Sequence, residues 1–90
     1  MLAIDSTAGF KKDYKRWKKH EDVVKLFQAV TLLLVHQEPL PPALCDHKLV
    51  GRLSHLRECH IRPNLLLIYE PMEGAIKFHR LCNHSELFNA

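Results

Sequence analysis

Residues 65–82 read LLLIYEPMEGAIKFHRLC, and the change of pattern along this stretch decides the fold. Leu65 to Tyr69 is a continuous apolar run, which is typical of a central strand covered on both faces. Pro71 to Gly74 supplies turn residues, and Ala75 to Leu81 then alternates apolar with polar side chains. The stretch therefore predicts two neighbouring antiparallel strands, the first of them at the centre of a sheet.

A further strand is expected on the N-terminal side of this pair. Leu56 to Arg62 alternates, and the turn residues Arg62, Pro63 and Asn64 lead from it into the central run. Three consecutive strands joined by short turns predict an antiparallel meander.

The first half of the chain has the helical period instead. Leu2 to Asp5 predicts a short strand, and Ser6 or Thr7 can cap a helix that ends near Lys19. Phe10, Tyr14 and Trp17 fall on one face of this helix, which we interpret as a core face.

A second helix is expected to begin with Asp22 as its N-cap. Its apolar positions recur at helical spacing, and three prolines end it because proline lacks the N–H that a helix needs. The apolar positions are Val23, Phe27, Val30 and Leu34, and the prolines are Pro39, Pro41 and Pro42.

These elements predict an α+β fold of one domain spanning residues 1–90. We expect a short N-terminal strand, a two-helix hairpin packed on an antiparallel sheet, and a short C-terminal helical turn. In that turn, Leu87 and Phe88 are expected to pack so that His84 stands at a cleft.

Composition limits the classes of function. The longest apolar run is far shorter than a bilayer span of ~20 residues, and the first residues lack the pattern of a secretory signal. The three cysteines have no paired spacing, which indicates reduced thiols. We therefore expect a cytoplasmic protein with no membrane partner.

The net charge of +3 is unevenly distributed. Six basic residues crowd the first predicted helix and leave it a basic outer face. Such a face is usually only solvated surface, but it is also suited to binding an anion. The six are Lys11, Lys12, Lys15, Arg16, Lys18 and Lys19.

Seven histidines in 90 residues is a high density, and three of them stand near ends of the predicted sheet. These three are His47, His60 and His84. The unperturbed imidazole titrates near neutral pH, so grouped histidines can divide the roles of general acid and base between them.

Metal and cofactor chemistry are disfavoured. The spacings between His55 and His60 and between His79 and His84 match half of a zinc motif, but the paired cysteines of the other half are missing. Phosphate loops and dinucleotide-binding glycine patterns are also missing. We expect no metal and no cofactor.

Histidines together with Arg57, Arg62 and Arg80 would suit metal-free attack at a phosphodiester. A base takes the proton of the attacking hydroxyl, cations stabilise the added negative charge, and an acid protonates the leaving oxygen. RNA carries its own nucleophile in the 2′-OH.

The second half of the chain resembles a known family. LPPALCDHKLVG, RECHIRPN, LLLIY and RLCNHSELF occur in the order that is typical of the YafQ-like branch of the RelE superfamily, the ribosome-dependent mRNA endonuclease toxins of bacterial toxin–antitoxin pairs. The resemblance implies cleavage of messenger RNA on the 70S ribosome. It also implies inhibition by a cognate antitoxin of the DinJ-like ribbon-helix-helix type.

By motif position, His47, His60 and His84 match the family's functional histidines, and Phe88 matches its terminal aromatic residue. Arg57 and Arg80 match basic positions. We expect the three histidines to be catalytic. The expected phosphate- or RNA-binding set is Arg57, Arg62, Asn64, Arg80, Phe88, Lys11, Lys12, Lys15 and Arg16.

One position departs from the family pattern. Asn64 and Leu65 stand where the family usually has Asp and Trp, and an amide cannot take up a proton. The departure leaves a second hypothesis open, a weak or inactive relative that binds antitoxin or ribosome without cutting. A plain basic RNA-binding domain is disfavoured because exposed aromatic residues on neighbouring strands are missing.

Overall fold

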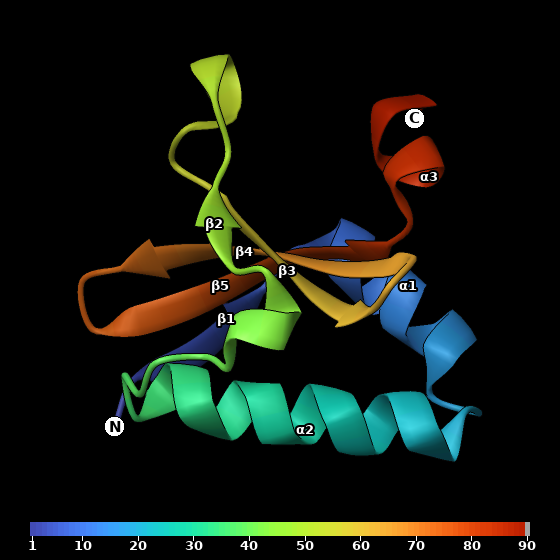
Figure 1. The fold of residues 1–90 in the computed structure, drawn as a ribbon, viewed down its shortest axis with the longest axis horizontal. Coiled ribbons are helices and arrows are strands. Elements are labelled where there is room, and N and C mark those ends of the chain that lie inside the picture. The colour runs from blue at the N-terminus through green and yellow to red at the C-terminus, as the bar shows by residue number, and fades with distance from the viewer. Residues whose placement is uncertain (90) are drawn as a thin grey trace.

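In the computed structural model, which describes residues 1–89 apart from the side chains of Phe88 and Asn89, a five-stranded sheet carries two long helices on one face (Figure 1). A short third helix and the segment around β2 stand on the opposite side. The elements are β1 (Ala3–Ser6), α1 (Ala8–Trp17), α2 (Glu21–Val35), η1 (Pro42–Leu44), β2 (His47–Lys48), η2 (Gly51–Leu53), β3 (Arg57–Arg62), β4 (Leu65–Met72), β5 (Ala75–Cys82) and α3 (His84–Asn89).

The strands lie in the order β1-β5-β4-β3-β2. β3, β4 and β5 form the expected antiparallel meander, with β4 in the middle of the sheet. β1 pairs with β5 in parallel, so the sheet is mixed. The α+β class is confirmed, and the two helices form the connection that carries the chain from β1 back to the sheet.

Of the two predicted helix N-caps, one agrees with the structure and one does not. The predicted cap of α1 is confirmed, because Thr7 Oγ1 accepts a hydrogen bond from Phe10 N at 3.0 Å. The predicted cap Asp22 is wrong. α2 begins at Glu21 after His20, and Asp22 lies in the first turn, where a negative charge is favoured by the helix dipole.

Other boundaries differ by a few residues. α1 ends at Trp17 rather than near Lys19, and the two-residue strand β2 was not expected. Two residues are too few to show a periodic pattern in the sequence. The strand exists because these residues pair with β3. Among residues 1–89, no helix is both long and apolar enough to cross a membrane.

The main core lies between the helices and the sheet. The predicted aromatic face of α1 is confirmed as a core face, since Phe10 packs against Phe27 and Phe78 with ring centroids 5.6 and 5.1 Å away. Tyr14 and Trp17 pack at its margin. Cys59 and Tyr69 face this core from the sheet.

A second, smaller core covers the other face of the sheet. Leu66 and Ile68 of β4 are fully buried there, and Leu56 is buried beside them. Leu49 and Leu87 pack against them, one from the segment after β2 and one from α3. β4 is therefore buried on both faces, as its unbroken apolar run predicts.

Beyond the end of β1, a side chain of α1 binds the backbone of β5 that has no strand neighbour on that side. Asp13 is buried, and its Oδ2 accepts hydrogen bonds from Leu81 N at 2.9 Å and Arg80 Nε at 2.7 Å. A helix side chain thus replaces the missing strand neighbour. The contact holds α1 against the end of β5.

Removing this carboxylate should destabilise the whole fold. Asp13→Ala leaves the buried Leu81 amide without its acceptor and the partly exposed Arg80 guanidinium without its partner, and an unsatisfied buried donor costs about 1–3 kcal/mol. Urea unfolding followed by circular dichroism would measure the change. Asp5→Ala, at an exposed position, is the control and should change stability little; equal effects of the two substitutions would contradict the role of Asp13.

Candidate active site

A buried carboxylate lies at the centre of the predicted histidines. Glu58 is on β3, on the face of the sheet away from the long helices, and its side chain is only 5% exposed. Its Oε1 lies 3.0 Å from Nε2 of His84, 3.4 Å from Nε2 of His60 and 3.8 Å from Nε2 of His47. The structure therefore brings all three predicted histidines together.

Each histidine reaches Glu58 by a different structural route. His60 is two residues further along β3 and so lies on the same face of the strand. His47 is the residue of β2 that pairs with Glu58. His84 is the first residue of α3, and its ring meets that of His60 edge-on, with centroids 6.0 Å apart.

The short helix that carries His84 is held at both ends of its first turn. Asn83 Oδ1 accepts from Glu86 N at 2.7 Å, and Glu86 Oε1 accepts from Asn83 N at 3.3 Å, which together form a capping box. Leu87 packs in the smaller core, as expected. The side chain of Phe88 lies outside the described part of the chain.

Hydrogen bonds give His47 and His84 different proton arrangements. Nδ1 of His47 lies 2.7 Å from the carbonyl oxygen of Cys45, which can only accept, so Nδ1 carries the proton. The neutral ring then keeps a lone pair on Nε2. In His84 the carboxylate of Glu58 accepts from Nε2, so a proton sits there. One ring is arranged as a base and the other as a donor.

The predicted arginines are not gathered around these histidines. Each of them, in the described residues, forms an ion pair with a carboxylate from a distant part of the chain. The pairs are Arg16 with Glu86, Arg57 with Asp46, Arg62 with Asp22 and Arg80 with Asp13. The carboxylate partners raise the pKa of Arg16, Arg57 and Arg80.

Arg16 and Arg80 lie between α1 and α3, whereas Arg57 lies on the face of the sheet that carries the main core. Arg16 and Arg80 line one surface hollow together with Lys12. Arg57 points to the opposite face from Glu58 and His60, because it occupies the alternate position on β3. Their expected roles in RNA binding stay predictions.

The other predicted binding residues are at the surface. Lys11, Lys12 and Lys15 are exposed on α1, which agrees with a basic outer face. Asn64 is exposed in the turn between β3 and β4. Next to that turn, a hollow of about 420 Å³ is lined by His60, Arg62 and residues of η1. The surface beside His60 therefore has room for a ligand.

Two of the three thiols are unsuited to nucleophilic chemistry. Cys59 and Cys82 are fully buried, and burial raises the pKa of both thiols, that of Cys59 to about 12. Cys45 is exposed. All three are free, as the unpaired spacing predicts.

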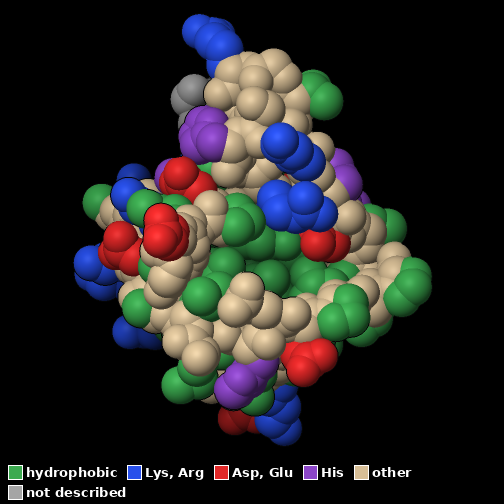
Figure 2. All heavy atoms as spheres, turned by 90° about the vertical axis from the view of Figure 1, so that its left-hand side faces the viewer, with side chains coloured by type: hydrophobic (Ala, Val, Ile, Leu, Met, Phe, Trp, Pro, Cys, Tyr) green, Lys and Arg blue, Asp and Glu red, His purple; other side chains and the backbone are tan. Residues whose placement is uncertain are grey.

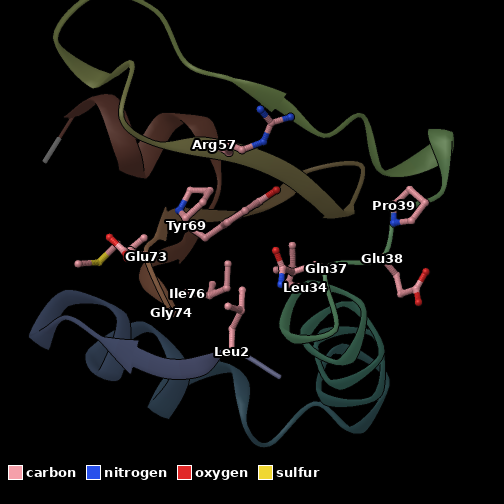
Figure 3. A pocket seen from close by; sticks show the side chains of 12 residues that line it. Leu2, Leu34, Gln37, Glu38, Pro39, Arg57, Tyr69, Glu73, Gly74 and Ile76 are labelled. Carbon is pink, nitrogen blue, oxygen red and sulfur yellow. The ribbon is translucent and has the colours of Figure 1, made fainter.

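A larger hollow of about 620 Å³ lies elsewhere, between the end of α2 and the turn from β4 to β5. Figure 2 shows hydrophobic side chains gathered in the depression with charged groups around it. Its lining includes Leu2, Leu34, Tyr69 and Ile76, with Arg57 above them (Figure 3). It contains none of the three site histidines.

Comparison with known proteins identifies the family. Residues 2–89 match the model of the bacterial toxin YafQ of type II toxin–antitoxin systems. The chain belongs to the YafQ toxin family. A curated relative from Escherichia coli K12, named mRNA interferase toxin YafQ, is 35% identical over 86 residues and covers 94% of both chains. Relatives in the family are thus endoribonucleases by name.

Solved structures agree with this assignment. A metal-bound toxin from Helicobacter pylori is 40% identical, covers 98% of this chain and 100% of its own, and superposes with a TM-score of 0.89. YafQ in the E. coli complex with the antitoxin DinJ is 28% identical over 97% of each chain, with a TM-score of 0.84.

Imidazole nitrogens and a carboxylate are also the groups that bind transition metals. Among the described residues, no group of three or more such side chains is arranged to hold a metal ion. The metal of the H. pylori toxin is a property of that protein, and the expectation of metal-free chemistry here stays a prediction.

Sequence patterns did not identify Glu58 as part of the site. The residue lies within the RECH motif of the predicted strand, but a glutamate in an alternating strand is usually interpreted as exposed to solvent. The alternation of β3 was the available signal, since it places Glu58 on the same face as His60.

Proposed function

We propose that this protein is a ribosome-dependent mRNA endonuclease and the toxin of a type II toxin–antitoxin pair. It cuts translated message without a metal ion and thereby inhibits translation and growth. The observation that carries the proposal is the set of three imidazoles around Glu58, with His47 arranged as a base and His84 as a proton donor.

In the proposed reaction the 2′-OH of RNA attacks the adjacent phosphate. His47 and His60 take the 2′ proton and hold the phosphate, and His84 protonates the 5′ oxygen that leaves. The products are a 2′,3′-cyclic phosphate and a 5′-hydroxyl end. Arg62 lines the hollow beside His60, so in this proposal Arg62 and the proton donor His84 stabilise the added negative charge.

The proposed partners are the 70S ribosome, its mRNA and a cognate antitoxin. The complex of E. coli YafQ with DinJ supports a DinJ-like antitoxin. The ribbon-helix-helix type of this antitoxin is part of the proposal. The exposed lysines of α1 support contact with ribosomal RNA, since RNA phosphates attract a dense basic face. The proposed site of action is the cytoplasm.

Substitution of His84 tests the proposed proton donor. His84→Gln should lower single-turnover cleavage on programmed ribosomes by ~10²- to 10⁴-fold, because a positioned proton donor is lost. Antitoxin binding and thermal stability should be unchanged. His36→Gln, at an exposed position after α2, is the control. Wild-type activity of His84→Gln would contradict the proposal.

The products distinguish metal-free from metal-dependent cleavage. Wild-type cleavage should leave 2′,3′-cyclic phosphate ends and should persist after the toxin is treated with a transition-metal chelator. The magnesium that keeps ribosomes assembled must be held constant. Loss of cleavage on chelation, with recovery on adding copper or zinc, would instead support a metal site at the histidines.

Charge reversal tests the basic face of α1. The double variant Lys11→Glu, Lys15→Glu should bind ribosomes more weakly and with a flatter dependence on salt, because fewer phosphate contacts release fewer counterions. The double variant Lys25→Glu, Lys77→Glu has the same net charge and is the control. Sedimentation with ribosomes at several salt concentrations measures both. Equal binding by the two variants would mean that the α1 face is only solvated surface.

Asn64 tests the alternative of a weak or inactive relative. We expect the natural sequence to cut RNA, and Asn64→Asp not to gain the ~10²-fold that restoring a missing acid or base would give. Both residues suit a turn, so the substitution changes charge with little change of fold. Undetectable cleavage by the natural sequence, with recovery in Asn64→Asp, would favour the inactive relative.

A further inference from the structure

The segment that carries His47 has few contacts of its own. β2 consists of His47 and Lys48 alone, and both residues are exposed. It lies at the edge of the sheet, so only one of its sides is paired. Pairing with β3 and the packing of Leu49 hold this segment on the sheet, but neither contacts the residues directly before His47, so a further contact is needed to fix the direction of its side chain.

That contact is made by the preceding residue, Asp46. Its Oδ1 accepts a hydrogen bond from Tyr69 Oη at 2.5 Å. Arg57 donates from Nε to Oδ1 at 3.3 Å and from its terminal nitrogen to Oδ2 at 3.1 Å. Both carboxylate oxygens are therefore bound, which fixes the side chain in position and orientation.

The two groups that bind Asp46 belong to the rigid part of the sheet. Arg57 and Tyr69 are paired residues of β3 and β4, and Tyr69 is 2% exposed. Burial and the hydrogen bond to Asp46 raise the pKa of Tyr69, so its hydroxyl stays protonated and keeps donating. Both residues line the large hollow, and Figure 3 shows Arg57 above the Tyr69 side chain.

Asp46 and His47 lie on opposite faces of the sheet. Asp46 is bound on the face of Tyr69 and Cys59, whereas His47 lies beside Glu58 on the other face. Successive residues of an extended chain point in opposite directions, so fixing Asp46 fixes the direction of His47. The bond from His47 Nδ1 to the Cys45 carbonyl then sets the rotation of the ring.

We propose that Tyr69 and Arg57, acting through Asp46, are positioning residues for His47. The inference rests on the proposed function, in which His47 helps to activate the 2′-OH. In this proposal Arg57 helps to position the general base His47, although Arg57 itself lies on the opposite face of the sheet from the proposed RNA site. A buried tyrosine of the central strand thereby contributes to cleavage without touching the substrate.

Tyr69→Phe tests this role, because it removes one hydroxyl and conserves the ring. We expect kcat for cleavage on programmed ribosomes to fall about 10- to 100-fold, the scale of a misplaced catalytic group, with KM for ribosomes unchanged. Tyr14→Phe is the matched control. Tyr14 packs against the same main core and forms no hydrogen bond through its hydroxyl among the described residues.

A double-mutant cycle separates positioning from general damage. If Tyr69 acts through His47, Tyr69→Phe should have no further effect in a His47→Ala background. The same fold loss in both backgrounds would overturn the proposal, as would full activity of the single variant. Asp46→Asn should resemble Tyr69→Phe in its loss of kcat.

A spectroscopic measurement keeps the inference testable if the natural sequence does not cut RNA. Ring signals of the histidines, followed by ¹H–¹³C NMR, should change in Tyr69→Phe more for His47 than for His60 or His84. Unchanged His47 signals would overturn the positioning role. Absence of cleavage together with a selective His47 change would overturn the proposed function alone.

Discussion

Burial of β4 on both faces is the constraint on which the rest of the structure depends. Leu65, Leu67 and Tyr69 need cover on one side, and α1 and α2 supply it. Leu66 and Ile68 need cover on the other side, where no long helix lies. Exposing these apolar side chains to water is unfavourable, so the second face of β4 must also be packed against other parts of the chain.

The second cover also assembles the candidate active site. Leu49 follows β2, which carries His47, and Leu87 belongs to α3, which carries His84. Packing of these two leucines over β4 brings both histidines to the face where β3 presents Glu58 and His60. The same hydrophobic contacts therefore stabilise the fold and place the rings, which links folding to the proposed chemistry.

Ion pairs then connect the elements that hydrophobic packing leaves loosely attached. The pairs of Arg80 and Arg57 are mostly shielded from water, whereas the pair of Arg16 with Glu86 is more exposed and should contribute less. Arg16 lowers the pKa of Glu86. Its stabilising effect is therefore present above the ordinary pKa range of a carboxyl group and is lost as pH falls through the lowered pKa.

The sequence alone determined the elements, because hydrophobic period is a local property. The unbroken run from Leu65 marked β4, the spacing of Phe10 and Tyr14 marked the inner face of α1, and the histidines and RECH motif indicated the family. Only the tertiary structure decided what the charges do. Glu58, Asp46 and Asp13 find their partners through strand pairing and helix packing, and no spacing along the chain encodes such distant contacts. Charge partners depend on which faces meet in space, so the centre of the site and the roles of its arginines had to come from the fold.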